Sequence, residues 1–160
     1  MSILHELGIR KRSNKLKEEF LYTLASSYML CEKEISSALA PYGLSSVKMN
    51  ALLVVKHIGK NKGISQVNIC KKMIVSAGNM TGLINRLERQ KLVERIIQSV
   101  DRRVNLIKIT KKGADLLDKV WPIYKNKVDQ VIPLSRAKII TTVAALSRLR
   151  ERIYEIQQNL

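Results

Sequence analysis

The chain has 160 residues, the size of one domain or of one subunit of a small oligomer. With 46% hydrophobic residues it can bury a core, which excludes a wholly disordered protein. Its 29 Lys and Arg against 13 Asp and Glu give a net charge of +16, which indicates a polyanionic partner, either nucleic acid or an anionic membrane surface.

Several classes of protein are disfavoured. No apolar run approaches the length of a membrane span, and the N-terminus lacks the apolar segment of a signal peptide. Cys31 and Cys70 are too few for a disulfide framework and lack metal-ligand spacing, and there are only two histidines. No phosphate-binding glycine loop or nucleophile motif is present. We therefore expect a cytoplasmic protein that is not an enzyme, with no cofactor, no metal and no membrane partner.

The positive charge is concentrated in the middle of the chain. Residues 48–112 carry fifteen basic and three acidic side chains, net +12, whereas residues 1–47 are net +1 and residues 113–160 are net +3. A cationic centre within a nearly neutral frame is expected of a module that contacts phosphates. The basic residues are spread over several short elements instead of one amphipathic helix, which argues against a membrane surface.

The first predicted element is a long helix over residues 13–40. Apolar residues recur every three or four positions along it, at Leu16, Phe20, Leu24, Tyr28, Cys31, Ile35 and Leu39. At 1.5 Å per residue this helix spans roughly 40 Å, too long for a small core to cover. Part of the stripe should therefore pack on another chain.

Three shorter helices are predicted next, over residues 46–59, 65–73 and 76–90. Ser45 or Ser46, then Ser65, then Ser76 can cap them. The side chains expected to point inward are Ala51, Leu52, Val55 and Ile58 in the first, Val67, Ile69 and Cys70 in the second, and Met80, Leu83, Ile84 and Leu87 in the third.

Residues 92–97 and 104–109 are rich in β-branched side chains and predict two strands of a hairpin with a basic loop at 98–103. Thr110 should cap a helix over 111–132, in which Pro122 predicts a kink. A final helix is predicted over 136–157, with the apolar stripe Ile139, Ile140, Val143, Leu146, Leu149, Ile153 and Ile156.

Three short helices followed by a basic hairpin predict a winged helix-turn-helix, mainly α with a small β-hairpin wing. Helix 76–90 suits a DNA major groove, because its apolar face lies opposite a small, polar and cationic one: Gly78, Asn79, Thr81, Gly82, Asn85, Arg86 and Arg89. Arg102 and Arg103 should enter or approach a minor groove, and Asp101 should pair with an arginine and hold the wing in shape. The candidates for phosphate contacts are Lys48, Lys71, Lys72, Lys108, Lys111 and Lys112. Ser76, at the start of helix 76–90, is a further candidate for contacting DNA.

In this order and spacing the motifs resemble the MarR family of bacterial transcriptional regulators. They are the run from Ala77 to Val93, Asp101-Arg102-Arg103, and the run Ile109-Thr110-Lys111-Lys112-Gly113, with 39–44 resembling the connection between the family's first two helices. The resemblance implies an obligate homodimer interlocked through helices at 13–42 and 113–157, with a DNA-binding lobe at 46–112. It implies repression at palindromic operators, released by a small anionic or phenolic ligand. By position Thr81, Asn85 and Arg86 match the recognition helix, and Asp101 and Arg103 match the wing pair.

The chain departs from the family pattern at three positions. Gly82 stands where many members carry Arg, Lys91 where the turn usually has Gly, and Asn85 where Asp is frequent. These departures bear on which operator is bound. Residues Tyr28, His57, Trp121 and Tyr124 are candidates for lining a ligand pocket, with ordinary packing as the alternative.

Two alternative functions remain open. One is a winged helix that binds nucleic acid without sequence specificity through the same basic surface. The other is a regulator that senses oxidants through Cys31, for which burial as an inert core thiol is the competing interpretation.

Overall fold

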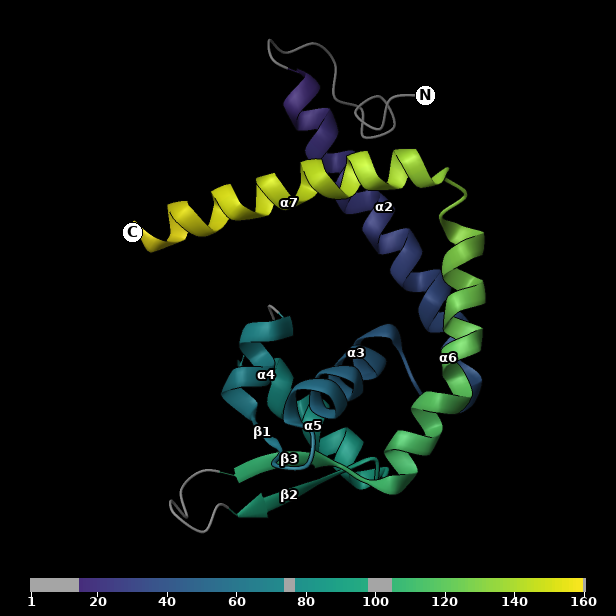
Figure 1. The fold of residues 1–160 in the computed structure, drawn as a ribbon, viewed down its shortest axis with the longest axis vertical. Helices are drawn as coiled ribbons and strands as arrows, with labels where there is room; N and C mark the ends of the chain where they lie inside the picture. The colour runs from purple at the N-terminus through teal and green to yellow at the C-terminus, as the bar shows by residue number, and fades with distance from the viewer. Residues whose placement is uncertain (1–14, 74–76, 98–104, 160) are drawn as a thin grey trace. The chain divides into compact units, whose positions relative to one another are not determined.

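The computed structural model describes residues 15–73, 77–97 and 105–159. It contains two compact units, Met1–Val128 and Asp129–Leu160. The elements are, in chain order, α2 (Lys15–Leu39), the 3-10 turn η1 (Ala40–Tyr42), α3 (Ser46–Val54), the π-helical turn η2 (Val55–Gly59), β1 (Ile64–Ser65), α4 (Gln66–Met73), α5 (Ala77–Arg89), β2 (Val93–Ile97), β3 (Asn105–Ile109), α6 (Lys111–Val131) and α7 (Arg136–Gln158) (Figure 1).

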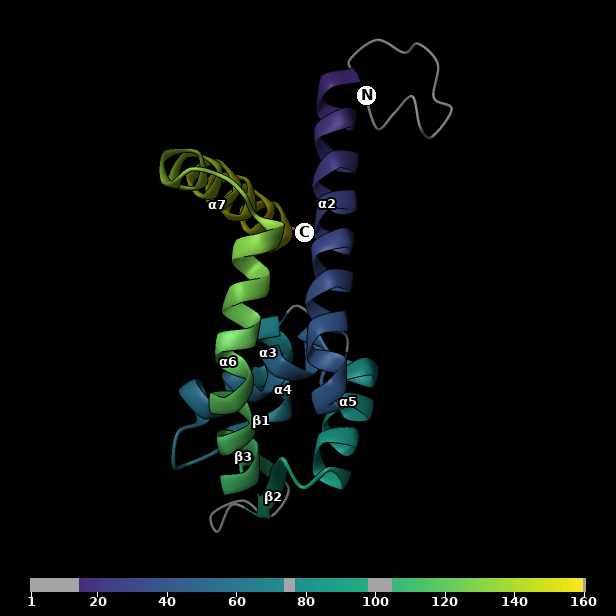
Figure 2. The same ribbon diagram turned by 90° about the vertical axis from the view of Figure 1, so that its right-hand side faces the viewer.

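The predicted long N-terminal helix is confirmed as α2, which is uninterrupted in Figure 2. Its apolar stripe is buried only at its C-terminal end, where Leu39 is fully buried, whereas Leu16 is 79% exposed. Gly43 ends the following turn with φ 69°, in the left-handed region that glycine adopts without strain. Three of the seven stripe residues, Leu16, Phe20 and Tyr28, are therefore left exposed by the described part of this chain.

Hydroxyl side chains cap three helices at the predicted places, while the cap predicted at Ser76 lies outside the described residues. Ser45 caps α3 by accepting from the Lys48 N–H at 3.3 Å, and Ser65 accepts from the Asn68 N–H at 3.3 Å. Thr110 accepts from the Gly113 N–H at 3.0 Å at the start of α6. Ser46, the other candidate for capping α3, instead donates its hydroxyl to Glu32 on α2 at 2.7 Å.

Two side chains predicted to point inward are exposed. Val67 is 63% exposed because α4 turns Ile69 inward, and residues two apart on a helix lie on nearly opposite sides. Ile58 is 49% exposed because the chain there forms the π-helical turn η2 instead of continuing the α-helix. The wider turn places Gly59, not Ile58, in line with the buried Val55.

The sheet has three antiparallel strands in the order β1-β3-β2, one more than the predicted hairpin. Strands β2 and β3 pair with Val93 opposite Ile109 and Arg95 opposite Ile107. The added strand β1 is only two residues long, with Ile64 opposite Ile107. It ties the start of α4 to the sheet.

One hydrophobic core lies within the first unit. The predicted inward face of α5 is confirmed, since Met80, Ile84 and Leu87 are fully buried and Leu83 is 4% exposed. The remaining buried hydrophobic residues of this core are Leu39, Leu44, Met49, Ala51, Leu52, Val55, Ile64, Ile69, Leu92, Val93, Ile107, Leu117 and Val120. The core therefore joins the three short helices, the sheet and the first half of α6.

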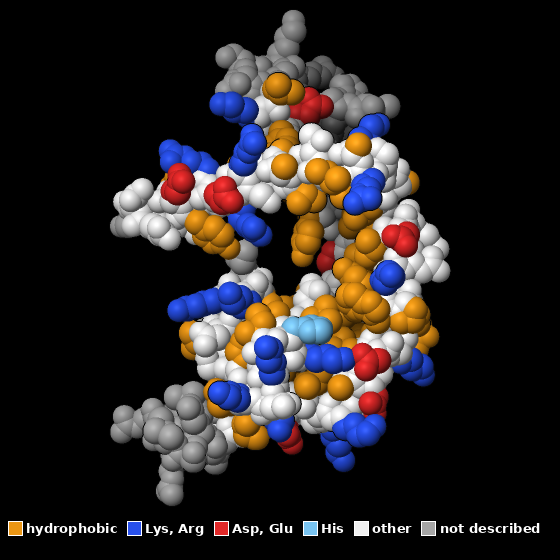
Figure 3. All heavy atoms as spheres, in the orientation of Figure 1, with side chains coloured by type: hydrophobic (Ala, Val, Ile, Leu, Met, Phe, Trp, Pro, Cys, Tyr) orange, Lys and Arg blue, Asp and Glu red, His pale blue; other side chains and the backbone are white. Residues whose placement is uncertain are grey.

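Helix α6 continues through Pro122, and its ribbon is bent in Figure 1. The second unit consists mainly of α7, which Ser135 caps by accepting from the Lys138 N–H. Helix α7 has no buried residue, and apolar side chains are visible on its surface in Figure 3. No single described helix is long and apolar enough to cross a membrane. The segments Leu16–Tyr42 and Ser46–Gly59, bent by 78° at their junction, together have the length and composition of a membrane span.

Candidate DNA-binding interface

Helix α5 has one apolar face in the core and one polar face in solvent. On the polar face the side chains of Asn79, Thr81, Asn85, Arg86 and Arg89 are exposed, as predicted. Because the core holds the opposite face, the helix presents these side chains at a fixed orientation. Such an exposed, polar and cationic helix has the size and chemistry that a DNA major groove accepts.

Within the described residues, Gly78 and Gly82 on this face have no packing role. A Cβ atom at position 78 would meet nothing within 4 Å, and one at 82 would meet only the flexible end of Arg86, at 3.5 Å. Neither glycine has a positive φ. Glycine in a helix interior is less favourable than alanine by about 1 kcal/mol, so nothing in the described chain accounts for Gly82. Close approach of an external partner would account for both residues.

Arg86 and Arg89 of α5 lie beside shallow hollows on the surface. Among the described residues Arg86 and Arg89 form no ion pair. Arg86 borders a hollow of about 470 Å³ that is also lined by Val47, Gly78, Asn79, Gly82 and Leu83. Both arginines border a second hollow of about 310 Å³, together with Lys48 and Gln90. Their guanidinium groups are therefore available to an external anion.

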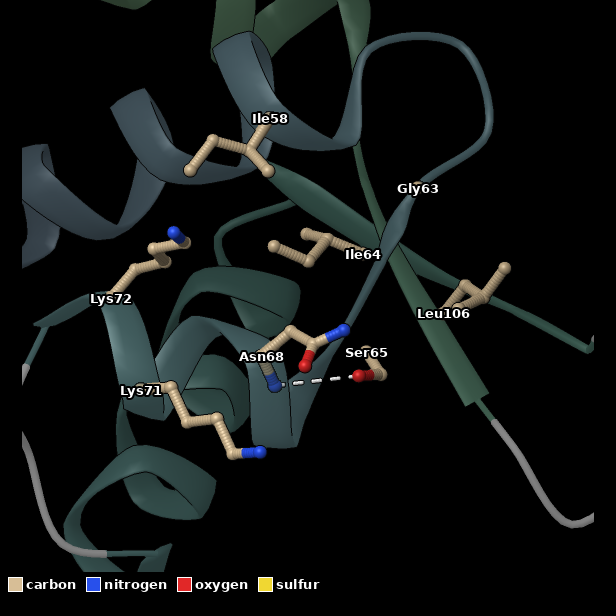
Figure 4. Close-up of a pocket in the computed structure, with 8 residues that line it drawn as sticks. All are labelled: Ile58, Gly63, Ile64, Ser65, Asn68, Lys71, Lys72 and Leu106. Atoms are coloured by element: carbon tan, nitrogen blue, oxygen red, sulfur yellow. Dashed lines mark hydrogen bonds between the residues drawn. The ribbon is translucent and has the colours of Figure 1, made fainter. Parts of the chain in front are cut away.

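Five of the six predicted phosphate-binding lysines fall into two groups. Lys71 and Lys72, in the last turn of α4, form no ion pair with any described residue and border a hollow of about 740 Å³ (Figure 4). Three others are engaged locally: Lys48 donates to the Gly43 carbonyl at 2.8 Å, Lys112 donates to the Gln90 carbonyl at 2.9 Å, and Lys111 pairs with Asp115 at 2.7 Å. The sixth, Lys108, belongs to neither group and lies on β3 opposite Glu94 of β2. The contact with Asp115 raises the pKa of Lys111.

Sequence reasoning missed two residues of neighbouring elements that contact α5. Gln66, the first residue of α4, donates to the Thr81 hydroxyl at 2.6 Å. Arg95 on β2 donates to the Asn85 Oδ1 atom at 2.6 Å and forms an ion pair with Glu88. Only the three-residue spacing of Asn85 and Glu88, which places both on one side of a helix, hinted at a shared partner.

The turn after α5 shows which backbone conformation Lys91 adopts. The Leu92 N–H donates to Leu87 O at 3.0 Å and the Lys91 N–H donates to Glu88 O at 2.8 Å. This pair of bonds is the Schellman motif, whose central residue takes the left-handed conformation and is usually glycine. Lys91 has a φ of 59°, so a lysine occupies a position that favours glycine.

Four predicted DNA contacts, at Ser76, Asp101, Arg102 and Arg103, lie outside the described residues, as does the pairing predicted for Asp101. Strands β2 and β3, which lead into and out of the predicted wing loop, are described and adjacent.

Three of the four residues predicted to line a ligand pocket come together. His57 and Trp121 border a hollow of about 310 Å³ with Leu53, Lys56, Leu117 and Asp118, and Lys56 pairs with Asp118 at 2.6 Å. Tyr124 stacks on Trp121 with ring centroids 5.4 Å apart. Tyr28 is 67% exposed on α2 and does not line this hollow.

The two cysteines are free thiols. Cys31 on α2 and Cys70 on α4 are both partly buried. Sensing of oxidants by Cys31 therefore stays a prediction, tested by its alkylation rate. Within the described ranges no group of three His, Cys, Asp or Glu side chains could hold a metal ion.

Comparison with known proteins agrees with this geometry. A model of the MarR family matches residues 42–104. The transcriptional regulator MhqR of Bacillus subtilis is 25% identical over 127 residues, covering 79% of this chain and 86% of MhqR. Two solved structures share the fold. A mutant of MarR from Escherichia coli complexed with operator DNA has a TM-score of 0.74 at 18% identity, covering 80% of this chain and 91% of that one. CouR from Rhodococcus jostii, bound to p-coumaroyl-CoA, has a TM-score of 0.71 at 20% identity, covering 85% and 94%.

The matched region coincides with the lobe that carries the cationic face of α5, and the similarity to MhqR extends into the helices on either side of that lobe. The family model, the curated relatives and the shared fold therefore all point to the MarR family of transcriptional regulators.

Proposed function

We propose that this chain is a cytoplasmic, homodimeric repressor that binds a pseudo-palindromic operator in double-stranded DNA. Helix α5 enters a major groove, the wing loop at 98–103 approaches the flanking minor groove, and Lys71 and Lys72 contact phosphates. The observation that carries the proposal is the polar face of α5, where Arg86 and Arg89 form no ion pair with a described residue and Arg86 lies beside Gly82, a glycine that no described contact requires. Similarity of the fold to a MarR protein complexed with operator DNA supports it.

The uncovered apolar stripes support the homodimer. Side chains along α2 such as Leu16 and Tyr28, and along α7 such as Ile140 and Val143, are more than half exposed. Burying an apolar side chain of this size stabilises a protein by about 1.5–3 kcal/mol, so a second copy of the chain would gain much by covering them. Two-fold symmetry then requires two half-sites about one helical turn apart, roughly 34–36 Å.

Fluorescence anisotropy tests the proposal directly. Duplex DNA from upstream of the chain's own gene is compared with a scrambled duplex of equal length, at two salt concentrations. Operator-specific proteins bind their site about 10³–10⁷ times more tightly than other DNA, so a preference of a hundredfold or more is expected. Equal and steeply salt-dependent binding to the upstream duplex, the scrambled duplex and genomic fragments would instead support a winged helix without sequence specificity.

The hollow beside Trp121 is the proposed site of a small anionic or phenolic ligand that releases DNA. Lys56 and His57 supply polar groups there, while Leu53, Leu117 and the indole ring supply apolar surface. CouR, which shares the fold, holds an aromatic acyl thioester. Trp121 is the only tryptophan of the chain, so its fluorescence reports on this hollow.

Titration with aromatic carboxylates and phenols should change the Trp121 emission and lower the affinity for DNA over the same concentration range. A Leu117→Phe variant, which fills part of the hollow, is expected to weaken both responses together. Ligands that change DNA binding without changing the emission would place the effector site elsewhere.

A further inference from the structure

We propose that Arg95 orients the Asn85 side chain so that Asn85 selects a base carrying a keto oxygen in the major groove, guanine or thymine, over a base carrying an amino group. Arg95 is thus a positioning residue for specificity, and Asn85 is the residue that touches the base. The inference rests on the proposed function, because it takes α5 as the helix in the major groove.

The contact joins the wing strand to the recognition helix. Arg95 lies on β2, and its side chain reaches back to α5. Its Nη2 atom donates to Asn85 Oδ1 at 2.6 Å, while Nη1 pairs with the Glu88 carboxylate. Asn85 and Glu88 are three residues apart, so both lie on one side of α5. The rigid, planar guanidinium can serve two such acceptors at once, which a lysine cannot do in the same way.

This contact determines which end of the Asn85 amide points outward. A guanidinium has donors only, so the amide atom facing Arg95 must be the oxygen. The amide nitrogen is left pointing away, on a side chain that is exposed and has no further partner among the described residues. The group offered to DNA is therefore an NH₂ with two hydrogen-bond donors.

Base edges differ in how they meet such a group. In the major groove guanine presents the acceptors N7 and O6 and thymine presents the acceptor O4, whereas cytosine presents an amino donor and adenine presents an amino donor beside its N7 acceptor. An unrestrained asparagine reads adenine by accepting from N6 and donating to N7. With its oxygen held by Arg95, Asn85 instead opposes an amino group with its own donors. A well-placed contact discriminates between bases by about five- to 150-fold.

The alternative role for Arg95 is a structural ion pair that only fastens β2 to α5. Glu88 would suffice for that role, and its ion pair with Arg95 is partly exposed on both sides. The two roles predict different effects. Loss of a structural pair lowers stability and weakens all DNA sites equally, whereas loss of the orienting contact changes the preferred base.

The test is selection from a random duplex library by the full-length dimer, followed by affinity measurements on the enriched sites. Asn85→Ala identifies the base pair that depends on Asn85. We expect the wild type to enrich guanine or thymine there. Arg95→Met and Arg95→Lys should lose that preference while keeping preferences elsewhere in the site. Asn85→Asp should invert it toward adenine or cytosine, because a carboxylate held by Arg95 presents an acceptor outward.

Glu88→Gln is the matched control, since its amide oxygen can still accept from Arg95 and leaves the contact with Asn85 in place. It should keep the wild-type preference. Thermal unfolding of every variant identifies any that do not fold. If both Arg95 variants fail to fold, the base preference of Asn85→Asp tests the inference, and a preference that does not change toward adenine or cytosine contradicts it.

Three results would overturn the inference while leaving operator binding intact: an adenine or cytosine enriched at the Asn85-dependent position, no position that depends on Asn85, or an unchanged preference in folded Arg95 variants. A wild-type dimer that enriches no sequence would overturn the proposed operator binding as well.

Discussion

Gly113 offers a direct test of how α6 is joined to the DNA-binding lobe. It lies in the first turn of α6, where the helix passes against the backbone that enters β2. A Cβ atom at this position would overlap the Leu92 carbonyl oxygen and lie 3.0 Å from both the Leu92 carbonyl carbon and Ile109 Cγ1. The same carbonyl oxygen accepts the Thr110 N–H at 3.1 Å. Gly113→Ala must therefore move one backbone segment away from another.

The expected loss of stability follows from three contributions. Overpacking costs about 1–3 kcal/mol, and loss of the Thr110–Leu92 hydrogen bond costs about 0.5–1.5 kcal/mol. The better helix propensity of alanine returns up to about 1 kcal/mol. The net is a destabilisation of about 0.5–4.5 kcal/mol, and each kcal/mol lowers Tm by about 2–4 °C in a chain of this length.

Gly82→Ala is the matched control, because it makes the same chemical change in a helix but brings the Cβ atom only into ordinary contact with the flexible end of Arg86, at 3.5 Å. It should raise stability by up to about 1 kcal/mol. Thermal unfolding is followed by circular dichroism at one fixed protein concentration, since Tm depends on concentration in a dimer. Equal Tm values for Gly113→Ala and the wild type would refute the reasoning, because they would show that α6 and Leu92 can separate freely.

Three further outcomes are expected. Lys91→Gly should stabilise the chain by about 0.5–1 kcal/mol in urea unfolding, because a left-handed lysine costs about 1–2 kcal/mol and the greater flexibility of glycine offsets part of that; a loss of stability would contradict this. Hydrogen bonds from Ser46 and then Ser36 hold the pKa of Glu32 below its ordinary value. Glu32→Gln should therefore lower Tm at pH 7, and the difference should shrink as the pH falls through about 4.3 and below, where the wild-type carboxylate is protonated; a difference independent of pH would exclude the carboxylate as its cause. Lys71→Ala should weaken binding to operator and scrambled DNA alike and reduce the slope of log K against log salt by about 1, whereas an unchanged slope would remove Lys71 from the phosphate contacts.

The elements were predictable because local chemistry specifies them. Ser45, Ser65 and Thr110 mark helix starts, since a hydroxyl that satisfies an unpaired N–H needs only neighbouring residues. The buried face of α5 follows from helical spacing alone, as Met80 and Ile84 show. The polar face of α5, and with it the cations Arg86 and Arg89, follows from the same spacing.

Features that depend on neighbours far along the chain were not predictable. Strand β1 is two residues long and exists only because β3 offers its edge. Ile58 fits an α-helical stripe, yet the π-helical turn exposes it. The junction between α2 and α3 is similar, because Glu32 meets Ser46 only when the two helices are folded against each other.

The amino-acid sequence by itself determined the succession of helices and strands, the cationic centre and the motif order of the family, because each depends on residues close together in the chain. Tertiary structure decided what the recognition helix presents. From its spacing alone Asn85 can either donate or accept, and only the contact with Arg95 on β2 turns its amide nitrogen outward. Gly82 stands out only in the folded chain, where little of the described structure lies beside it. Contacts between separate elements set the direction in which a side chain's donors and acceptors point. The spacing of residues within one element cannot predict those contacts.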